Sequence, residues 1–407
     1  MSRVLISGAS IAGPALAFWL RRAGWEPVVL ERAPALRTGG QNIDIRGAAR
    51  EVLRRMGIDD AVAAATTGEE GTEFIGRAGQ VVAAFPAGTS ESGGATGERE
   101  ILRGDLSEIL VGETRAGDRP VEYRFGDRVV GLVQEDGPDG RVHVTFAHGP
   151  DETFDLVVAA DGIGSSTRDL VFGDEVEIRS LDLQITYGTI PLTDTDKPWW
   201  RWYNAPGGRS VTLRPDRHGT TRATLTRLTD GQERAGVQDR SSEVLLGRLR
   251  ADFGDAGWQA GRVLDGFAAA DDLYSESIGQ VFAPAWSRGR VALLGDAAWC
   301  AAPVSGMGTS LSLVGAYVLA GELTTHDDHR AALAAYERVL RPYVDQAQKL
   351  PPGTPRLANP RTRAGIVAFQ TGLRVAAALP SWVGEKVFAP SVDTFALKDY
   401  GFDHAVS

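Results

Sequence analysis

The sequence is poor in the residues that build disulfides and metal clusters. Cys300 is the single cysteine among 407 residues, so no internal disulfide can form. The six histidines show no H-x-x-x-H or H-E-x-x-H spacing, and His326 with His329 lies in a polar stretch that is typical of a solvated loop. These shortages predict that the protein has no metal site.

Positive charge and long apolar runs are also scarce. The chain has 43 Lys and Arg against 53 Asp and Glu, a net charge of −10, which disfavours nucleic acid and anionic membrane surfaces as partners. No apolar run predicts a membrane span, and the first one is too short for a signal peptide and leads straight into a glycine turn. We therefore expect a cytoplasmic protein.

What the chain does contain is typical of a globular enzyme-sized protein. Hydrophobic residues make up 43% and charged residues 24% of the sequence. A length of 407 residues exceeds one ordinary core and predicts two domains that share a cleft.

A glycine-containing turn near the amino terminus predicts a dinucleotide site. The apolar run Arg3-Val4-Leu5-Ile6-Ser7 leads into Gly8-Ala9-Ser10-Ile11-Ala12-Gly13 and then into a helix. Gly8 permits the tight turn, Gly13 lets the helix pack closely on the strand, and the first helical N–H groups face a pyrophosphate. Ser10 stands where the middle glycine is usual. We expect the ligand to contact Gly8, Ser10, Ile11, Ala12 and Gly13.

The next strand supports this interpretation. It covers Glu26-Pro27-Val28-Val29-Leu30 and ends at Glu31, about twenty residues past the glycines, where a carboxylate accepts hydrogen bonds from a ribose diol. Arg32 is a candidate contact of the adenine. The alternative is a plain structural turn with no ligand.

The order of strands and helices predicts an α/β protein with a Rossmann-like nucleotide-binding domain and an antiparallel-sheet domain. The first domain comprises residues 1–72, 98–178 and 276–350, and the second comprises 73–97, with a Gly/Ser/Thr-rich loop at 87–97, and 179–275. Strands at 121–125, 128–134 and 142–147 are expected to form a meander. Residues 351–407 form a C-terminal segment whose helix, 362–379, is expected to clamp the two domains together.

Later motifs carry a family resemblance. Asp161-Gly162 ends the buried run 154–160, Gly295-Asp296-Ala297-Ala298 ends the strand 291–294, and two further matches cover 39–45 and 303–310. Together with the glycine turn, this set resembles the single-component FAD-dependent aromatic hydroxylases of the p-hydroxybenzoate hydroxylase type. It is most similar to the branch that hydroxylates tetracyclines and other polyketides, over roughly residues 1–350.

The resemblance implies FAD as the cofactor and adds site residues. Besides the turn and Glu31, the implied FAD contacts are Arg46, Arg103, Asp161, Gly295, Asp296, Pro303, Gly306, Met307 and Gly308. Each has a simpler interpretation: Asp296 suits a helix N-cap, Asp161 suits a turn, and Arg103 suits a helix surface. Family members often have histidine where this chain has Trp299, to which we assign no catalytic role.

The chemistry is also implied by the resemblance. Reduced flavin reacts with O2 to give a C4a-hydroperoxide that hydroxylates an aromatic or polyketide-like substrate, so no catalytic side chain is assigned. NADPH or NADH would reduce the flavin and dock transiently, because the sequence has no second glycine fingerprint. We expect a monomer or weak dimer.

The antiparallel region supplies candidate substrate contacts. They are Trp200, Trp202, Tyr203, Arg209, Arg214 and Thr226. Strand alternation places Trp200 and Trp202 on one face and Tyr203 on the other. Aromatic core packing is the equal alternative.

Two rival functions remain open at this point. A flavin-dependent halogenase is suggested by Trp200-Arg201-Trp202, but such enzymes need an early lysine and the first lysine here is Lys197. A non-catalytic flavoprotein that sequesters a drug-like ligand is the other.

Overall fold

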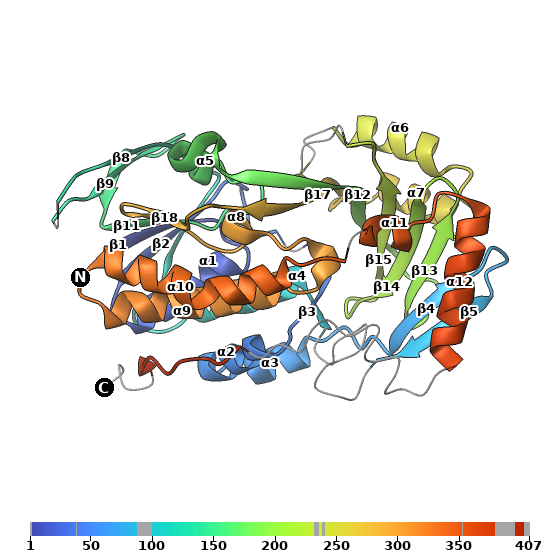
Figure 1. Ribbon diagram of the computed structural model, residues 1–407, viewed down its shortest axis with the longest axis horizontal. Coiled ribbons are helices and arrows are strands. Elements are labelled where there is room, and N and C mark those ends of the chain that lie inside the picture. Colours follow the sequence, from blue (N-terminus) through green and yellow to red (C-terminus); the bar gives the residue numbers. More distant parts are fainter. Residues whose placement is uncertain are drawn as a thin grey trace.

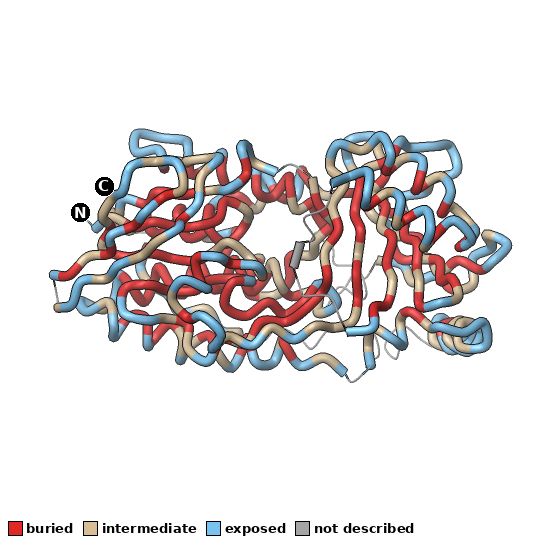
Figure 2. Tube along the Cα trace, turned by 90° about the horizontal axis from the view of Figure 1, so that it is seen from above, coloured by how far each residue is buried: buried red, intermediate tan, exposed pale blue. Residues whose placement is uncertain are grey.

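The computed structural model describes residues 2–37, 39–87, 100–137, 139–231, 236–237, 241–351, 353–378 and 395–402. Two lobes lie side by side, and two long strands, β12 and β17, run from one into the other (Figure 1). Each lobe has its own concentration of buried residues (Figure 2). The predicted loop at 87–97 and the end of the C-terminal segment lie mostly outside the described residues.

The first lobe is built on a six-stranded sheet in the order β18-β19-β11-β1-β2-β7. Its strands are β1 (Arg3–Ser7), β2 (Glu26–Glu31), β7 (Glu122–Phe125), β11 (Leu156–Ala159), β18 (Ser287–Arg288) and β19 (Val291–Leu293). All neighbours pair in parallel except β18, which is antiparallel to β19. The central strands are continuous apolar runs because both faces of this sheet are covered.

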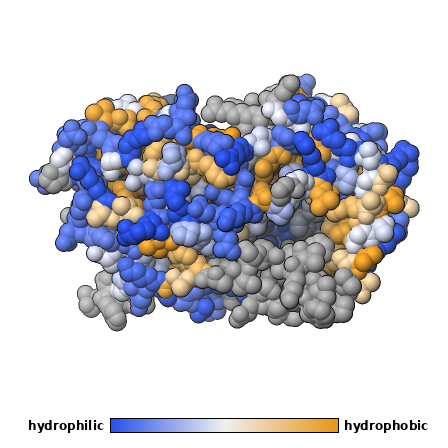
Figure 3. Space-filling view, viewed as in Figure 1, coloured by the Kyte–Doolittle hydropathy of each residue, from blue (hydrophilic) through white to orange (hydrophobic). Residues whose placement is uncertain are grey.

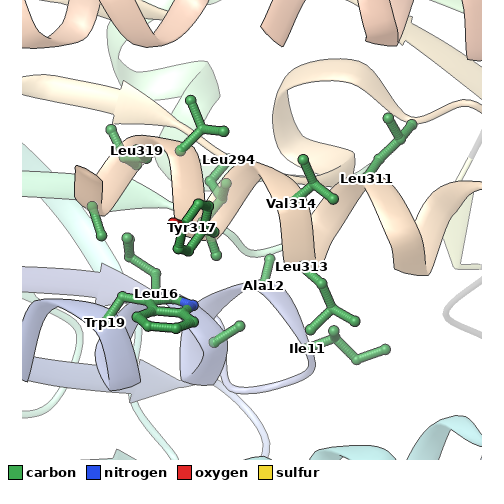
Figure 4. Close-up of a cluster of buried hydrophobic side chains, with 14 of the residues drawn as sticks. Ile11, Ala12, Leu16, Trp19, Leu294, Leu311, Leu313, Val314, Tyr317 and Leu319 are labelled. Carbon is green, nitrogen blue, oxygen red and sulfur yellow. The ribbon is translucent and has the colours of Figure 1, made fainter. Parts of the chain in front are cut away.

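Helices cover one face of that sheet, and a small sheet covers the other. Helix α1 (Ala12–Arg22) packs on α9 (Gly308–Thr325), which in turn packs on α10 (His329–Ala347). Figure 4 shows Trp19 of α1 beside Tyr317 of α9, with ring centroids 5.0 Å apart. On the opposite face, Leu5, Val28 and Leu30 pack against the three-stranded sheet β8 (Val129–Gln134), β9 (Val142–Phe146) and β10 (Glu152–Phe154).

The predicted three-strand meander differs from the structure. Its first member, β7, leaves the other two and pairs in parallel with β2. Tyr123 and Phe125 of β7 pack against the core of the first lobe, which accounts for its place at that edge. The general α/β architecture with one parallel and one antiparallel sheet is confirmed.

The second lobe is built on an eight-stranded sheet in the order β16-β17-β12-β15-β14-β13-β4-β5. The strands are β4 (Gly71–Ile75), β5 (Val81–Pro86), β12 (Glu177–Pro191), β13 (Trp200–Ala205), β14 (Arg209–Pro215), β15 (Thr220–Leu228), β16 (Gly236–Val237) and β17 (Tyr274–Phe282). Helices α6 (Ser242–Phe253) and α7 (Ala260–Ala268) cover one face, where Val211, Leu225 and Phe253 are buried together. The other face turns toward the first lobe.

The remaining elements connect or flank the lobes. They are β3 (Asn42–Asp44), α2 (Ala48–Met56), α3 (Asp59–Ala64), β6 (Glu100–Leu102), α4 (Arg103–Arg115), α5 (Ser166–Phe172), the 3₁₀ helices Gly173–Glu175 and Pro303–Ser305, α8 (Asp296–Trp299), α11 (Thr354–Ala358) and α12 (Arg363–Ala378). Within the described ranges, no helix has both the length and the apolar character that a membrane crossing requires.

The C-terminal segment contacts both lobes through two separate pieces. Helix α12 packs on β5 and β13 of the second lobe. Figure 3 shows hydrophobic side chains on that lobe, where α12 exposes Val367 and Val375. The later piece, 395–402, packs on the first lobe: Phe402 lies 4.9 Å from Trp19 between ring centroids, and Tyr400 donates a hydrogen bond to Glu322.

A buried ion cluster ties β14 to the segments ahead of β4 and at β6. The Arg214 guanidinium donates to both carboxylate oxygens of Glu69, at 2.9 and 3.1 Å, and also contacts Glu100. Asn42 and Thr67 donate to the other oxygen of Glu100 at 2.6 and 2.8 Å. Two carboxyls therefore compete for one cation. Burial raises the pKa of Glu69 to about 8, an effect that Arg214 opposes and Glu100 reinforces.

This cluster predicts a stability that falls with rising pH. Glu69 binds its proton more tightly in the folded chain than in the unfolded chain, where its pKa is about 4.5. Its stabilising proton is fully present below about 4.5 and is lost as the pH approaches about 8. In urea unfolding between about pH 5 and pH 8, the wild type should lose free energy of unfolding relative to Glu69→Gln.

The matched control is Glu175→Gln, which removes an exposed partner of Arg288 and should leave the pH slope unchanged. A constant difference between Glu69→Gln and wild type across the pH range would show that Glu69 does not hold its proton in the folded state.

Candidate functional site

A cavity of about 1020 Å³ lies between the two lobes. On one side it is lined by residues that follow β1, β2, β11 and β19, and thus by the carboxyl ends of the parallel strands. On the other side it is lined by the free face of the eight-stranded sheet. The crevice at the carboxyl ends of such strands is where open α/β sheets bind ligands.

The turn after β1 leaves no room for side chains at its two glycines. Gly8 has φ +116°, and a β-carbon there would lie 2.3 Å from the carbonyl oxygen of Ala160. A β-carbon on Gly13 would lie 1.9 Å from the carbonyl oxygen of Gly8. This close packing brings the start of α1 to the cavity, which is lined by Ser10, Ile11 and Ala12. Gly13 itself serves the packing and does not line the cavity.

Glu31 and Arg32 lie at the same end of the cavity. The Glu31 carboxylate accepts hydrogen bonds from the backbone N–H groups of Ala9 and Ala33, at 3.1 and 2.9 Å, and so holds the turn in place. It also lines the cavity, as does the exposed Arg32. Asp127 and Arg128 from the loop after β7 join them there, although no sequence pattern pointed to these two residues.

Arg103 stands in the middle of the cavity wall with part of its guanidinium unused. Its Nη1 lies 3.3 Å from Ser10 Oγ and its Nη2 lies 3.1 Å from the carbonyl oxygen of Gly39. Its buried Nε has no hydrogen-bond partner among the described residues. Gly40 makes room for it, because a β-carbon there would lie 2.6 Å from that Nε. The arginine is thus a lining residue and not a surface one.

The start of a second helix, α9, also lines the cavity. The loop after α8 forms the 3₁₀ helix Pro303–Ser305, turns at Gly306 with φ +65°, and enters α9 at Gly308. Pro303, Gly306 and Gly308 line the cavity. The positive ends of α1 and α9 therefore both face this space.

Acidic groups line the same region. The Asp296 carboxyl at the start of α8 lines the cavity. Desolvation by the surrounding protein raises the pKa of this carboxyl. Burial also raises the pKa of Glu276 on β17, and its hydrogen bond from Tyr187 opposes that rise. Arg103 faces both carboxyls and lowers the pKa of each. Sequence patterns missed Glu276, since it is one polar residue in an alternating strand.

Asp161 serves its own turn while it lines the cavity. Its carboxylate accepts hydrogen bonds from Ser165 Oγ and from Thr167 Oγ1, the latter at 3.0 Å. Burial raises the pKa of Asp161, and these hydrogen bonds oppose the rise. Arg46 also lines the cavity, with its guanidinium 2.9 Å from Asp44.

Two residues of the predicted cofactor set, Met307 and Gly295, occupy packing positions, and so does Trp299, which was not in that set. The Met307 side chain is buried in the core of the first lobe and does not line the cavity. Gly295, with φ +64°, lies against Ala12 and Ser312 and brings Asp296 into place. Trp299 packs on Trp286, with ring centroids 4.3 Å apart, and over Gly315, so it fills the core.

The sheet wall contains four of the six predicted substrate contacts. Trp200, Trp202, Arg214 and Thr226 line the cavity. Tyr203 and Arg209 differ from the prediction, because strand alternation turns both to the opposite face. Tyr203 donates a hydrogen bond to the carbonyl oxygen of Ala256 at 2.8 Å, and Arg209 pairs with Asp255 at 2.6 Å.

Several lining residues had no signal in the sequence. Tyr187 and Tyr274 stack with centroids 4.9 Å apart, and Tyr274 donates a hydrogen bond to Gln41 at 2.9 Å. Asn359 and Phe369 come from the C-terminal segment. The pairing of distant strands and the packing of the C-terminal segment on the sheet bring these residues together.

These features fit FAD. Two helix starts face one continuous space, as the phosphates and the flavin ring of a single extended molecule require. The missing β-carbon at Gly8 allows the close approach of the backbone, and the missing one at Gly40 leaves room for Arg103, which lines the cavity. Glu31 lies at the end of β2, where a ribose would lie.

Comparisons with known proteins agree. Residues 1–349 match the FAD binding domain family. The chain is 36% identical over 429 residues to the FAD-dependent monooxygenase asL4 of Sarocladium schorii, covering 98% of both chains. It is 36% identical over 348 residues to a flavin-dependent monooxygenase of an unknown prokaryotic organism, covering 85% of this chain and 87% of that one.

A solved structure is also similar. The crystal structure of tetracycline destructase Tet(51) aligns with a TM-score of 0.80 and 29% identity, covering 98% of this chain and all of that one. The expected family and cofactor are thus confirmed. The chain belongs to the FAD binding domain family and is an FAD-dependent monooxygenase.

Proposed function

We propose that the protein is an NAD(P)H-consuming monooxygenase that hydroxylates an aromatic or polyketide-like small molecule. The observation that carries this proposal is that one continuous cavity runs from the glycine turn to an aromatic sheet wall. A cofactor held by the turn would lie in the same space as a flat ligand on the sheet.

The residues present would divide the work as follows. The starts of α1 and α9, Arg103 and Asp296 would bind FAD, which supplies the activation of O2 and the transfer of one oxygen atom once it is reduced. The sheet wall would orient the substrate against it. Burial between two lobes excludes water and so favours oxygen transfer over wasteful decay of the activated cofactor.

The pyridine nucleotide is expected to bind transiently. The sequence has one glycine fingerprint, and the turn that carries it is at the place where FAD fits. A pyridine nucleotide that binds only transiently in the cavity does not need a second nucleotide-binding domain. The resemblance to the single-component hydroxylases supports this part of the proposal.

The halogenase alternative finds little support. Lys197 lies outside the cavity wall, half-exposed, with its Nζ 3.2 Å from Glu73. The described residues that line the cavity include no lysine. A non-catalytic flavoprotein would have the same cavity, so turnover separates it from the proposed enzyme.

Substitution at the glycine turn should remove FAD. Gly13→Ala places a β-carbon 1.9 Å from the carbonyl oxygen of Gly8, which forces α1 away from the turn. We expect FAD affinity to fall by at least about tenfold, corresponding to about 1.4 kcal/mol, measured by flavin absorbance after gel filtration. The matched control is Gly112→Ala, where a β-carbon has nothing within 4 Å. Equal FAD content in both variants would contradict the assigned binding turn.

Turnover should need both a reductant and a ligand. With FAD-loaded protein, NADPH or NADH oxidation should accelerate when an aromatic polyketide that fits the cavity is added, and the product should be heavier by one oxygen atom. Mass spectrometry over a set of such compounds measures this. Ligand binding without any stimulated oxidation, across the whole set and with both reductants, would favour the sequestering flavoprotein instead.

A further inference from the structure

One row of side chains crosses six of the eight strands of the sheet along the cavity. Strand register aligns Phe74, Trp202, Thr212, Thr224, Tyr187 and Tyr274, and all six line the cavity. Phe74 and Trp202 stack at one end, with centroids 5.9 Å apart and planes at 26°. In the centre, the two threonine hydroxyls lie 2.6 Å apart and bond to each other. This row offers apolar ring surface to a flat ligand.

Two hydrogen-bond donors at the Phe74 end have no partner among the residues that the structure describes. The Nε1 atoms of Trp200 and Trp202 are buried and unpaired among the described residues, and their rings lie 5.1 Å apart. Trp19 and Trp299 also have unpaired Nε1 atoms, but both lie in the core of the first lobe and do not line the cavity. A buried unpaired donor is costly. Both indoles line the cavity, so a rotation of either ring that turns its N–H toward a ligand oxygen would remove that cost.

An acceptor without a partner in the described part of the chain also lines the cavity near β13. Asn204 on β13 donates to the carbonyl oxygen of Ala358 at 2.8 Å and so fixes α11 over the sheet. The next residue, Asn359, is 2% exposed and lines the cavity. Its Nδ2 donates to Pro355 at 3.0 Å, while its Oδ1 has no partner among the described residues. Asn359 lies beyond residue 349, where the match to the family ends.

The positive charges on this wall are already paired. Arg214 is held by Glu69 and Glu100, as described above. Arg222 lies 3.1 Å from Asp216 and 3.2 Å from Asp272. The charges of these arginines are already neutralised by carboxylates of the protein. A ligand carboxylate against this wall would lose its hydration without gaining an ion pair that compensates for it. The wall therefore favours an uncharged ligand.

We propose that Trp200, Trp202 and Asn359 determine substrate specificity by hydrogen bonding to two edges of a flat, uncharged ring system. The indole N–H groups donate to carbonyl or phenol oxygens on one edge, and Asn359 Oδ1 accepts from a hydroxyl group on another. This inference rests on the proposed function, because it assigns the sheet end of the cavity to the substrate.

The test is equilibrium binding to FAD-loaded protein without any reductant, so that it does not depend on turnover. The probes are fluorene, 9-fluorenone, 2-hydroxy-9-fluorenone and 9-fluorenone-2-carboxylate, titrated by quenching of tryptophan emission and by the flavin spectrum. The variant Trp200→Phe/Trp202→Phe keeps the rings and removes both donors. It should weaken 9-fluorenone about tenfold and fluorene less than about twofold.

Asn359→Leu keeps the bulk of the side chain and removes the acceptor. It should cancel the advantage of 2-hydroxy-9-fluorenone over 9-fluorenone, which we expect to be about fivefold in the wild type. The carboxylate probe should bind at least about tenfold more weakly than 9-fluorenone. Trp258→Phe is the matched control, because Trp258 packs with Tyr203 on the other face of the sheet and should change each Kd by less than about twofold.

The inference is overturned if fluorene and 9-fluorenone lose equal affinity in the double variant, if the carboxylate binds best, or if no probe binds although the protein carries FAD. Loss of the flavin spectrum, or probe binding as expected with no ligand-stimulated NAD(P)H oxidation, would be failures of the proposed function and are seen separately.

Discussion

The site depends on one close approach of backbone to backbone. The turn after β1 passes very near to Ala160, which directly follows the neighbouring strand β11, and α1 packs closely on the turn. β-Carbons at Gly8 and Gly13 would therefore overlap with carbonyl oxygens. Because α1 packs directly on the turn, its free N–H groups reach the carboxyl edge of the parallel sheet. The same packing aligns α1 with α9, so that both helix starts face one space. A looser turn would still fold as an α/β layer but would present no cradle for phosphates.

The second lobe encloses the other side of the cavity. Strands β12 and β17 pair along their length and extend from one lobe to the other, which fixes the antiparallel sheet opposite the parallel one. Arg214, Glu69 and Glu100 join the same two regions by charge. The candidate cofactor contacts and the proposed substrate contacts thus belong to different sheets, and each sheet is held by its own core. Under the proposed function, the sheet wall can suit one kind of ligand without any change to the cofactor contacts.

Sequence patterns predicted the parts of the site that are local in the chain. The glycine turn, Glu31 and the Asp296 motif each follow a strand directly, so spacing alone places them at the sheet edge. Alternation also assigned Trp200 and Trp202 to one face of β13 and Tyr203 to the other, but it did not say which face meets the cavity. Tyr274 and Glu276 come from a strand about 90 residues beyond their partner strand β12, and Asn359 comes from the segment after the family match. No local pattern shows such contacts, since they depend on which distant strands pair. The displaced β7 illustrates the same limit within the first lobe.

We propose that the one cavity holds the flavin and the substrate together. A crystal structure of the protein loaded with FAD tests it most directly. We predict that the pyrophosphate lies at the start of α1 and that the isoalloxazine ring lies beside Asp296 and the start of α9. One face of that ring should be open toward Tyr187 and Thr224. FAD bound elsewhere, or a ring whose faces are both covered by protein and closed off from the sheet wall, would contradict it.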